Sequence, residues 1–230
     1  MAALATVARA VLDLVYPPRC AACGDATARE PFCPTCAGAV DPVPPGCARC
    51  GLPGPDAVCG ACLSAPPAFD AVLAGGLFGG PLADAVHRLK YGGHPALARP
   101  LGRWLAARVS LPAAAAVIAV PLARGRRIAR GYDQAALLAD ALARAARLPR
   151  LRAALWRSRE TPPQVGRSRA ERAANVRGAF QATPAVRGGD LLLVDDVVTT
   201  GATADAAAGA LRDAGARSVI VIALARADRG

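Results

Sequence analysis

A chain of 230 residues with 53% hydrophobic residues is long enough to bury a core, which excludes a globally disordered protein. The formal net charge of +11 is unevenly distributed: residues 1–70 carry four arginines and six acidic residues, whereas residues 124–177 carry fourteen arginines and four acidic residues. A chain-wide preference for arginine, with Lys90 as the only lysine, explains which cation is used but not its concentration in one segment. The segment 124–177 therefore predicts a polyanionic partner such as phosphate, pyrophosphate or nucleic acid.

Residues 1–17 predict an amphipathic helix that packs against the rest of the protein, because their apolar residues recur at helical spacing and a proline pair ends the run. The run is too short to span a bilayer and is interrupted by Arg9 and Asp13. It also lacks the basic start and the cleavage site of a signal peptide. We therefore expect no transmembrane segment and a cytoplasmic protein.

All eight cysteines lie in residues 18–66 and form four C-x-x-C pairs. The pairs are Cys20/Cys23, Cys33/Cys36, Cys47/Cys50 and Cys59/Cys62. Two thiolates at this spacing can bind one ion from a tight turn, and two such turns complete a tetrahedral site. The segment 18–66 therefore predicts a double zinc ribbon with two structural Zn²⁺ ions, and disulfides are less expected in the cytoplasm.

The cysteine segment also repeats internally, since Cys20-x-x-Cys23-Gly and Cys47-x-x-Cys50-Gly are each followed by a second pair without the glycine. This duplication favours sequential sites, in which the first two pairs hold one ion and the last two hold the other. An interleaved arrangement is the alternative.

From residue 67 to 230, short apolar runs alternate with stretches of helical period, as in a mostly parallel sheet covered by helices. The predicted strands are 71–78, 116–120, 190–194 and 218–223. The predicted helices are 82–90, 97–109, 134–147 and 203–214. The sequence thus predicts an α/β domain at 67–230, preceded by the small zinc module.

The segment 191–203, LLLVDDVVTTGAT, places two carboxylates and a Thr/Gly turn between a buried strand and a helix. Ligands of open α/β sheets bind at this end of the strands. Gly201 lets the backbone approach a ligand, and the amides and hydroxyls of residues 199–203 can donate to one phosphate. Asp195 and Asp196 would repel phosphate, but they suit the vicinal hydroxyls of a ribose or an Mg²⁺ ion. A buried acidic pair with a helix cap, or an aspartate-phosphorylation pocket, are the alternatives, and neither needs the Thr/Gly turn.

This turn resembles the phosphoribosyl-pyrophosphate (PRPP) loop of type I phosphoribosyltransferases, and the whole chain resembles the ComF family, which includes GntX-like proteins. Besides the cysteine pairs and the turn, the resemblance is carried by the segments 121–127, 130–134, 161–164 and 169–180. The family usually has Asn where this chain has Asp133. The extra negative charge would oppose pyrophosphate binding unless Asp133 caps the next helix.

The resemblance implies a type I phosphoribosyltransferase fold and assigns roles to individual residues. Asp195 and Asp196 would hold the ribose hydroxyls, and Thr199, Thr200, Gly201, Ala202 and Thr203 would hold the 5-phosphate of PRPP bound with Mg²⁺. The turn after Val120 would be the pyrophosphate loop, in which at most two of four arginines contact the ligand: Arg124, Arg126, Arg127 and Arg130. A mobile loop at 158–172 would close over the site, and the polar residues Gln164, Arg172 and Asn175 would face the ligand.

Three functions are compatible with these residues. The resemblance to ComF implies a role in handling single-stranded DNA, together with the DNA-uptake machinery, during natural transformation. A phosphoribosyltransferase of nucleotide metabolism is an alternative, although no sequence signature identifies its acceptor. A regulator that senses PRPP without chemistry is the third.

Overall fold

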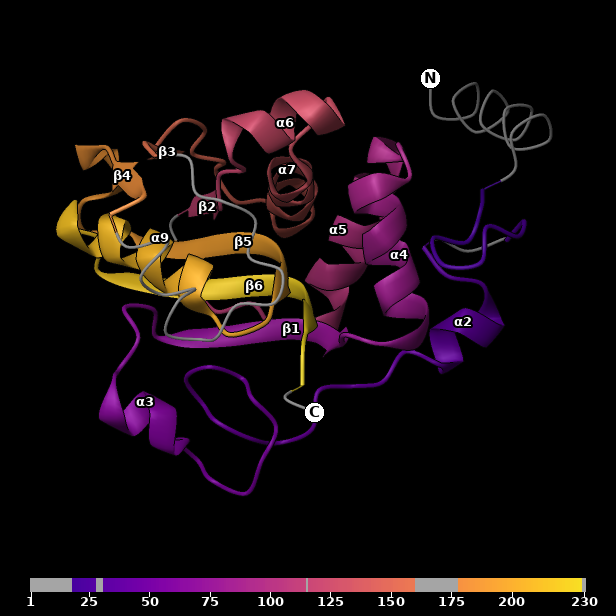
Figure 1. Cartoon of the computed structure of the whole chain (residues 1–230), viewed down its shortest axis with the longest axis horizontal. Coiled ribbons are helices and arrows are strands. Elements are labelled where there is room, and N and C mark those ends of the chain that lie inside the picture. The colour runs from indigo at the N-terminus through magenta and orange to yellow at the C-terminus, as the bar shows by residue number, and fades with distance from the viewer. Residues whose placement is uncertain (1–17, 28–30, 115, 160–177, 229–230) are drawn as a thin grey trace.

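The computed structural model describes residues 18–27, 31–114, 116–159 and 178–228 (Figure 1). The predicted amphipathic helix and three predicted ligand-facing residues, Gln164, Arg172 and Asn175, lie outside these ranges. Within the described ranges, no helix has the length and apolar character needed to cross a membrane.

A four-stranded parallel sheet forms the centre of the protein, in the order β1-β6-β5-β2. Its strands are β1 (Ala71–Leu77), β2 (Ala116–Ala119), β5 (Asp190–Val198) and β6 (Ser218–Arg226). Each lies where the sequence predicts a strand, and the parallel α/β class is confirmed.

Four long helices cover the two faces of this sheet (Figure 1). They are α4 (Gly80–Tyr91), α5 (Ala98–Arg108), α7 (Gln134–Ala146) and α9 (Ala202–Asp213). Leu192 and Val194 of β5 pack with α4, α5 and α7, whereas Leu191 and Leu193 pack with α9. Because both faces are buried, the strands are nearly continuous apolar runs, which is why the sequence shows them clearly.

Strands β5 and β6 continue beyond their predicted ends at residues 194 and 223. Asp195 pairs with Ala223 and Val198 pairs with Arg226, so the ladder passes through both carboxylates. The two carboxylates after residue 194 suggested that the strand ends there. Main-chain pairing does not depend on the side chain, however, when that side chain has its own partner or reaches solvent.

A small antiparallel ribbon of β3 (Leu155–Arg157) and β4 (Phe180–Ala182) lies outside the predictions. Its strands have three residues each, too few to show an alternating pattern. The other short elements of the described residues are η1 (Pro95–Leu97), η2 (Pro184–Val186), α2 (Pro34–Gly38), α3 (Gly60–Ser64) and α6 (Arg124–Arg130).

The two halves of the cysteine-rich segment pack on opposite faces of the sheet. Cys20 and Phe32 join the core formed with α4 and α5, and the Phe32 ring contacts Trp104 of α5 edge-on at 5.5 Å between centroids. Cys47 and Cys62 join the core formed with α9. The cysteine-rich segment therefore contributes to both cores of the α/β domain.

Candidate functional site

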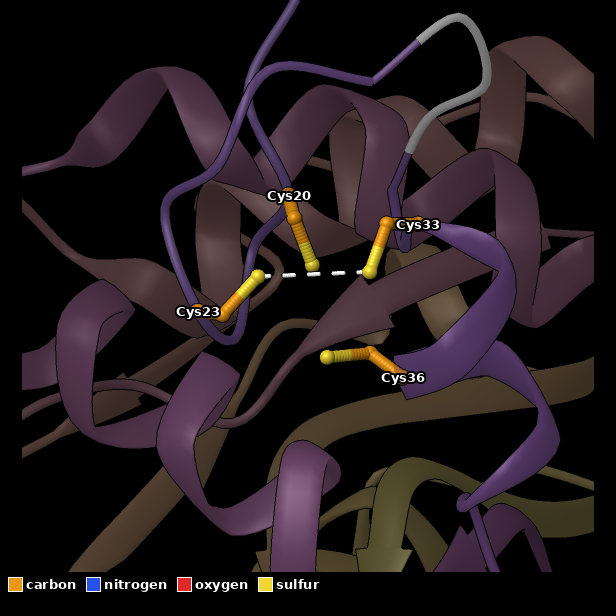
Figure 2. Close-up of side chains that lie close together, drawn as sticks. All are labelled: Cys20, Cys23, Cys33 and Cys36. Carbon is orange, nitrogen blue, oxygen red and sulfur yellow. Dashed lines mark hydrogen bonds between the residues drawn. The ribbon is translucent and has the colours of Figure 1, made fainter.

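The eight cysteines form two clusters of four, and in each cluster the sulfur atoms all lie within 4.8 Å of one another. The first cluster contains Cys20, Cys23, Cys33 and Cys36, whose sulfurs point toward a common centre (Figure 2). The second contains Cys47, Cys50, Cys59 and Cys62. The sequential arrangement is therefore confirmed, and the interleaved one is wrong.

The spacing of the sulfurs fits zinc. Tetrahedral bonds of about 2.3 Å would place the sulfurs about 3.8 Å apart. The Cys23 and Cys33 sulfurs are 3.9 Å apart, and those of Cys50 and Cys59 are 3.7 Å apart. These clusters suit two structural Zn²⁺ ions, each held by four thiolates.

Ionisation of the thiols differs within the first cluster. Burial opposes ionisation of Cys20, but hydrogen bonds from the backbone at Cys33, Cys23 and Ala22 lower its pKa to about 6. Burial and then the neighbouring thiols raise the pKa of Cys36 to about 12. Four thiolates at this distance repel one another, so a bound cation is needed to hold them together.

The predicted phosphate loop connects β5 to the N-terminus of α9. Gly201 has φ of +81°, a left-handed conformation that side chains with a Cβ rarely adopt, and α9 begins at the next residue. Residues 199–203 surround a small hollow of about 40 Å³. The loop therefore has the shape of an anion cradle, with the positive end of a twelve-residue helix behind it.

A larger cavity of about 830 Å³ opens beside this loop. Asp195, Asp196, Thr199 and Thr203 all line it, so both carboxylates and the ends of the loop reach one space. Phe78, His87 and Tyr91 form an aromatic part of its wall, which the sequence did not indicate.

The four arginines predicted for a pyrophosphate turn lie instead on the helix α6, which ends at Gly131 in a left-handed conformation. Arg126 and Arg130 are one helical turn apart and line the large cavity, as does Arg157 of β3. Arg124 and Arg127 line a different cavity on the other side of α6. A turn does follow Val120, at residues 121–123, but the arginines lie on the helix after it and not in the turn itself.

The two neighbouring carboxylates have different surroundings. Asp196 is 4% exposed, and both of its oxygens are engaged: Oδ1 by Lys90 Nζ at 2.8 Å and Oδ2 by Gln134 Nε2 at 2.6 Å. Lys90 comes from α4 and Gln134 from α7, so their contacts with Asp196 join two helices to β5. Arg130 donates in turn to Gln134 Oε1.

Asp195 is half-buried and accepts a hydrogen bond from the Asp196 amide at 2.8 Å. Burial, and then the charge of Asp196, raise the pKa of Asp195 to about 8, although Lys90 acts in the opposite direction. An incoming cation or hydroxyl donor would stabilise the ionised form of this carboxyl group. Asp195 is thus the better ligand of the two, and Asp196 is arranged as a positioning residue.

Comparison with known proteins agrees with this architecture. The family described as "Double zinc ribbon domain" matches residues 11–63, and the family described as "Phosphoribosyl transferase domain" matches residues 103–230. The "DNA utilization protein YhgH" of Salmonella typhi is 34% identical, over 85% of this chain and 90% of that protein. The "Competence protein F" of Haemophilus influenzae is 35% identical, over 74% of this chain and 78% of that protein. The chain belongs to the ComF family.

One solved structure, a glutamine PRPP amidotransferase from B. subtilis in complex with ADP and GMP, is 26% identical with a TM-score of 0.39. The alignment covers 54% of this chain but only 25% of that enzyme. The assignment of the chain to the ComF family rests on the two matching domain families and on the relatives above rather than on this likeness.

The aspartate that departs from the usual ComF pattern serves as a helix cap. Asp133 precedes α7, and its carboxylate accepts from the Ala136 amide at 3.0 Å and from the Leu122 amide at 3.1 Å. It lines the cavity on the far side of α6 and is not among the residues around the large cavity. Its carboxylate is therefore engaged by two backbone amides.

Arg226, at the end of β6, is a site residue that the sequence analysis missed. It is 1% exposed and donates to the carbonyls of Val198 at 3.0 Å and Thr199 at 2.6 Å, at the start of the phosphate loop. It also donates to the Cys50 carbonyl at 2.8 Å. In this ComF protein one buried cation thus connects the second cysteine cluster to the loop. A lone arginine ending an apolar strand was the signal that could have revealed it.

Proposed function

We propose that this ComF protein binds PRPP or a related ribose phosphate together with Mg²⁺, and that it acts in the handling of single-stranded DNA taken up by the cell. The choice of ligand rests on one observation: the acid pair, the phosphate loop and two arginines of α6 lie around one cavity. An anion cradle, diol-binding acids and a cationic wall together match a ribose that carries phosphates on both sides.

Each part of the ligand has a matching part of the site. Residues 199–203 would bind the 5-phosphate through main-chain amides and threonine hydroxyls. Arg126 and Arg130 would bind the pyrophosphate, because the planar guanidinium can contact two phosphate oxygens at once. Asp195 offers the hard oxygen donor that Mg²⁺ prefers, and a cation beside it would favour its ionised form.

The role in DNA handling is supported by relatives and by charge. The names of the relatives, "DNA utilization protein" and "Competence protein F", concern DNA and competence in those proteins. In this chain residues 124–177 carry fourteen arginines against four acidic residues, an excess of positive charge that suits a nucleic-acid backbone.

Calorimetric titration with PRPP and Mg²⁺ tests the ligand. We expect Asp195→Ala/Asp196→Ala to lower the affinity at least about tenfold, because each lost charge-assisted hydrogen bond is worth about 1.5–3 kcal/mol. Asp84→Ala/Asp213→Ala removes the same charge from exposed positions on α4 and α9 and should leave the affinity unchanged.

Because loss of Asp196 leaves Lys90 without its carboxylate, Asp195→Asn serves as a second variant that keeps the Lys90–Asp196 pair. It too should bind PRPP with Mg²⁺ more weakly. Equal affinity in wild type, Asp195→Asn and the double variant would refute the assigned ribose site.

A further inference from the structure

The outer side of α6 borders a second cationic space. It shares Pro121, Leu122 and Arg157 with the cavity of about 830 Å³, which we call the ribose-phosphate cavity, but it does not include Asp195, Asp196 or the phosphate loop. This second cavity of about 600 Å³ is lined by residues of β2, α6, α7 and β3. Figure 1 shows these elements at the β2 end of the sheet order. The second cavity adjoins a hollow of about 280 Å³ with which it shares Asp140, Arg150 and Arg152. We call the two together the arginine groove. Its cationic lining consists of Arg124, Arg127, Arg144, Arg147, Arg150, Arg152 and Arg157.

The acidic residues of the groove are already engaged within the protein. Asp133 caps α7 through the backbone, as described above. Asp140 pairs with Arg150 at 3.2 Å and with Arg152 at 2.6 Å.

Four other arginines of the groove face solvent. Arg124, Arg127, Arg144 and Arg147 are exposed, and no carboxylate of the described residues lies within ion-pair distance of them. The groove therefore presents a surplus of positive charge to an external anion.

An exposed tryptophan stands at the wall of this groove. Trp156 is 40% exposed and lines the 600 Å³ cavity of the groove. Its neighbour Leu155 is buried, because successive side chains of β3 point to opposite sides. The next residue, Arg157, lies 5.2 Å over the ring of Phe180 on β4, which connects this end of the ribbon to its partner strand. The indole is thus held at the surface by a paired strand rather than by a loop.

We propose that the arginine groove binds single-stranded DNA, with phosphates along the arginines and one base stacked on Trp156. An aromatic face beside a cationic track is the arrangement that binds single strands without reading their sequence. A duplex has no unpaired base to offer the indole, and an acidic peptide would use the charge but not the stacking surface. This inference rests on the DNA-handling part of the proposed function and not on the ribose-phosphate site.

The structure supplies a matched pair of variants, because α6 carries two arginines on each side. Arg124→Ala/Arg127→Ala alters the arginine groove, whereas Arg126→Ala/Arg130→Ala alters the ribose-phosphate cavity. Both variants remove the same charge from the same short helix. A difference between them therefore reports which cavity is used and not a change of net charge.

Binding of a fluorescent oligothymidylate to the full zinc-loaded chain is measured by anisotropy over a range of salt concentrations. Each contact with a phosphate of a single strand contributes about 0.7 to the slope of log K against log salt, so Arg124→Ala/Arg127→Ala should lower that slope by about 1.4. Arg126→Ala/Arg130→Ala should keep the slope and instead weaken binding of PRPP with Mg²⁺.

The stacking contact is tested separately. Trp156→Leu should weaken the oligothymidylate complex about 5- to 150-fold, the range expected for one stacked base, and Trp156→Phe should restore much of the loss. In the wild type, binding should quench tryptophan fluorescence, and the quenching should disappear in Trp156→Phe although Trp104 is retained.

The outcomes separate this inference from the ribose-phosphate proposal. If PRPP does not bind but the slope falls only in Arg124→Ala/Arg127→Ala, the groove is supported without the ribose-phosphate site. Equal slopes in the two arginine variants, or unchanged affinity in Trp156→Leu, would overturn the groove whatever the result with PRPP.

Discussion

Asp195 and Asp196 are adjacent on one strand, yet their surroundings give them different chemistry. Asp196 contacts Lys90 and Gln134, whereas burial and the charge of Asp196 favour the protonated form of Asp195 by raising its pKa. Successive residues of a strand point to opposite faces, so neighbours in sequence can have few common contacts. At this site one acid positions the other.

The raised pKa of Asp195 predicts how stability depends on pH in the absence of ligand. The native carboxyl keeps its proton up to about pH 8, whereas its usual pKa is 3.8, so the folded state binds more protons than the unfolded state between these values. Stability contributed by this residue therefore falls as pH rises through that window. Asp195→Asn removes this pH dependence. The free energy of unfolding of Asp195→Asn minus that of wild type should therefore increase with pH.

Urea denaturation of the zinc-loaded chain at about pH 6 and about pH 8 measures this difference. Asp84→Asn, at an exposed position on α4, is the control and should show no such trend. A constant difference between Asp195→Asn and wild type at both pH values would contradict the prediction.

At the scale of elements, the phosphate loop depends on parts of the chain far from it in sequence. Arg226 of β6 connects the Thr199 and Val198 carbonyls to the Cys50 carbonyl, and Asp205 of α9 accepts from the Ala68 amide at 2.7 Å. The loop is thereby fixed to both the sheet and the zinc module. Its conformation is a property of several elements together.

Arg226→Met should therefore weaken both stability and ligand binding. Loss of the donor to the buried Cys50 carbonyl costs about 1–3 kcal/mol, and loss of the bonds to the Val198 and Thr199 carbonyls leaves the loop less well ordered for phosphate. Arg226→Lys keeps the charge but not the branched geometry and should recover only part of the loss. Thermal denaturation and calorimetry with PRPP and Mg²⁺ measure the two effects.

Arg217→Met is the matched control for this prediction. Arg217 pairs with Asp190 at the surface, with 70% of its side chain exposed, and exposed pairs contribute at most about 1 kcal/mol. If Arg226→Met and Arg217→Met have the same small effect on stability and on PRPP affinity, the buried connection has no such role.

For the whole molecule, the cysteine clusters lie on the two faces of one sheet and take part in both of its cores. A segment of this size cannot build a sufficient core alone, so metal binding and docking to the sheet stabilise each other. The zinc module is therefore structural for the whole protein as well as for itself.

Removal of zinc should consequently destabilise the phosphoribosyltransferase-like domain. The chain should contain two zinc ions, one for each cluster, and a strong chelator should lower the midpoint of thermal unfolding measured from the helices of the domain. Metal analysis and circular dichroism follow the two quantities, and restored zinc should restore the midpoint. An unchanged midpoint after complete loss of zinc would show that the module and the domain are energetically independent.

Several features follow from the sequence because they depend on local patterns. The four main strands and four long helices lie close to their predicted ranges, since strands buried on both faces and amphipathic helices have distinct periodicities. The cysteine spacing predicted two tetrahedral sites, and the internal repeat predicted which pairs share an ion. The Thr/Gly turn was placed correctly between β5 and α9 because only a few conformations connect a strand to a helix so tightly.

Other features required the tertiary structure because they join residues distant in sequence. The pairing of Lys90 and Gln134 with Asp196, the connection from Arg226 to Cys50, and the docking of the cysteine clusters on opposite faces depend on how helices pack on the sheet. Composition located the arginine-rich segment at residues 124–177. Only the helical geometry of α6 divides its own four arginines between two cavities. The physical reason is that local periodicity depends on a few neighbouring residues, whereas the partner of a side chain is chosen by packing across the whole fold.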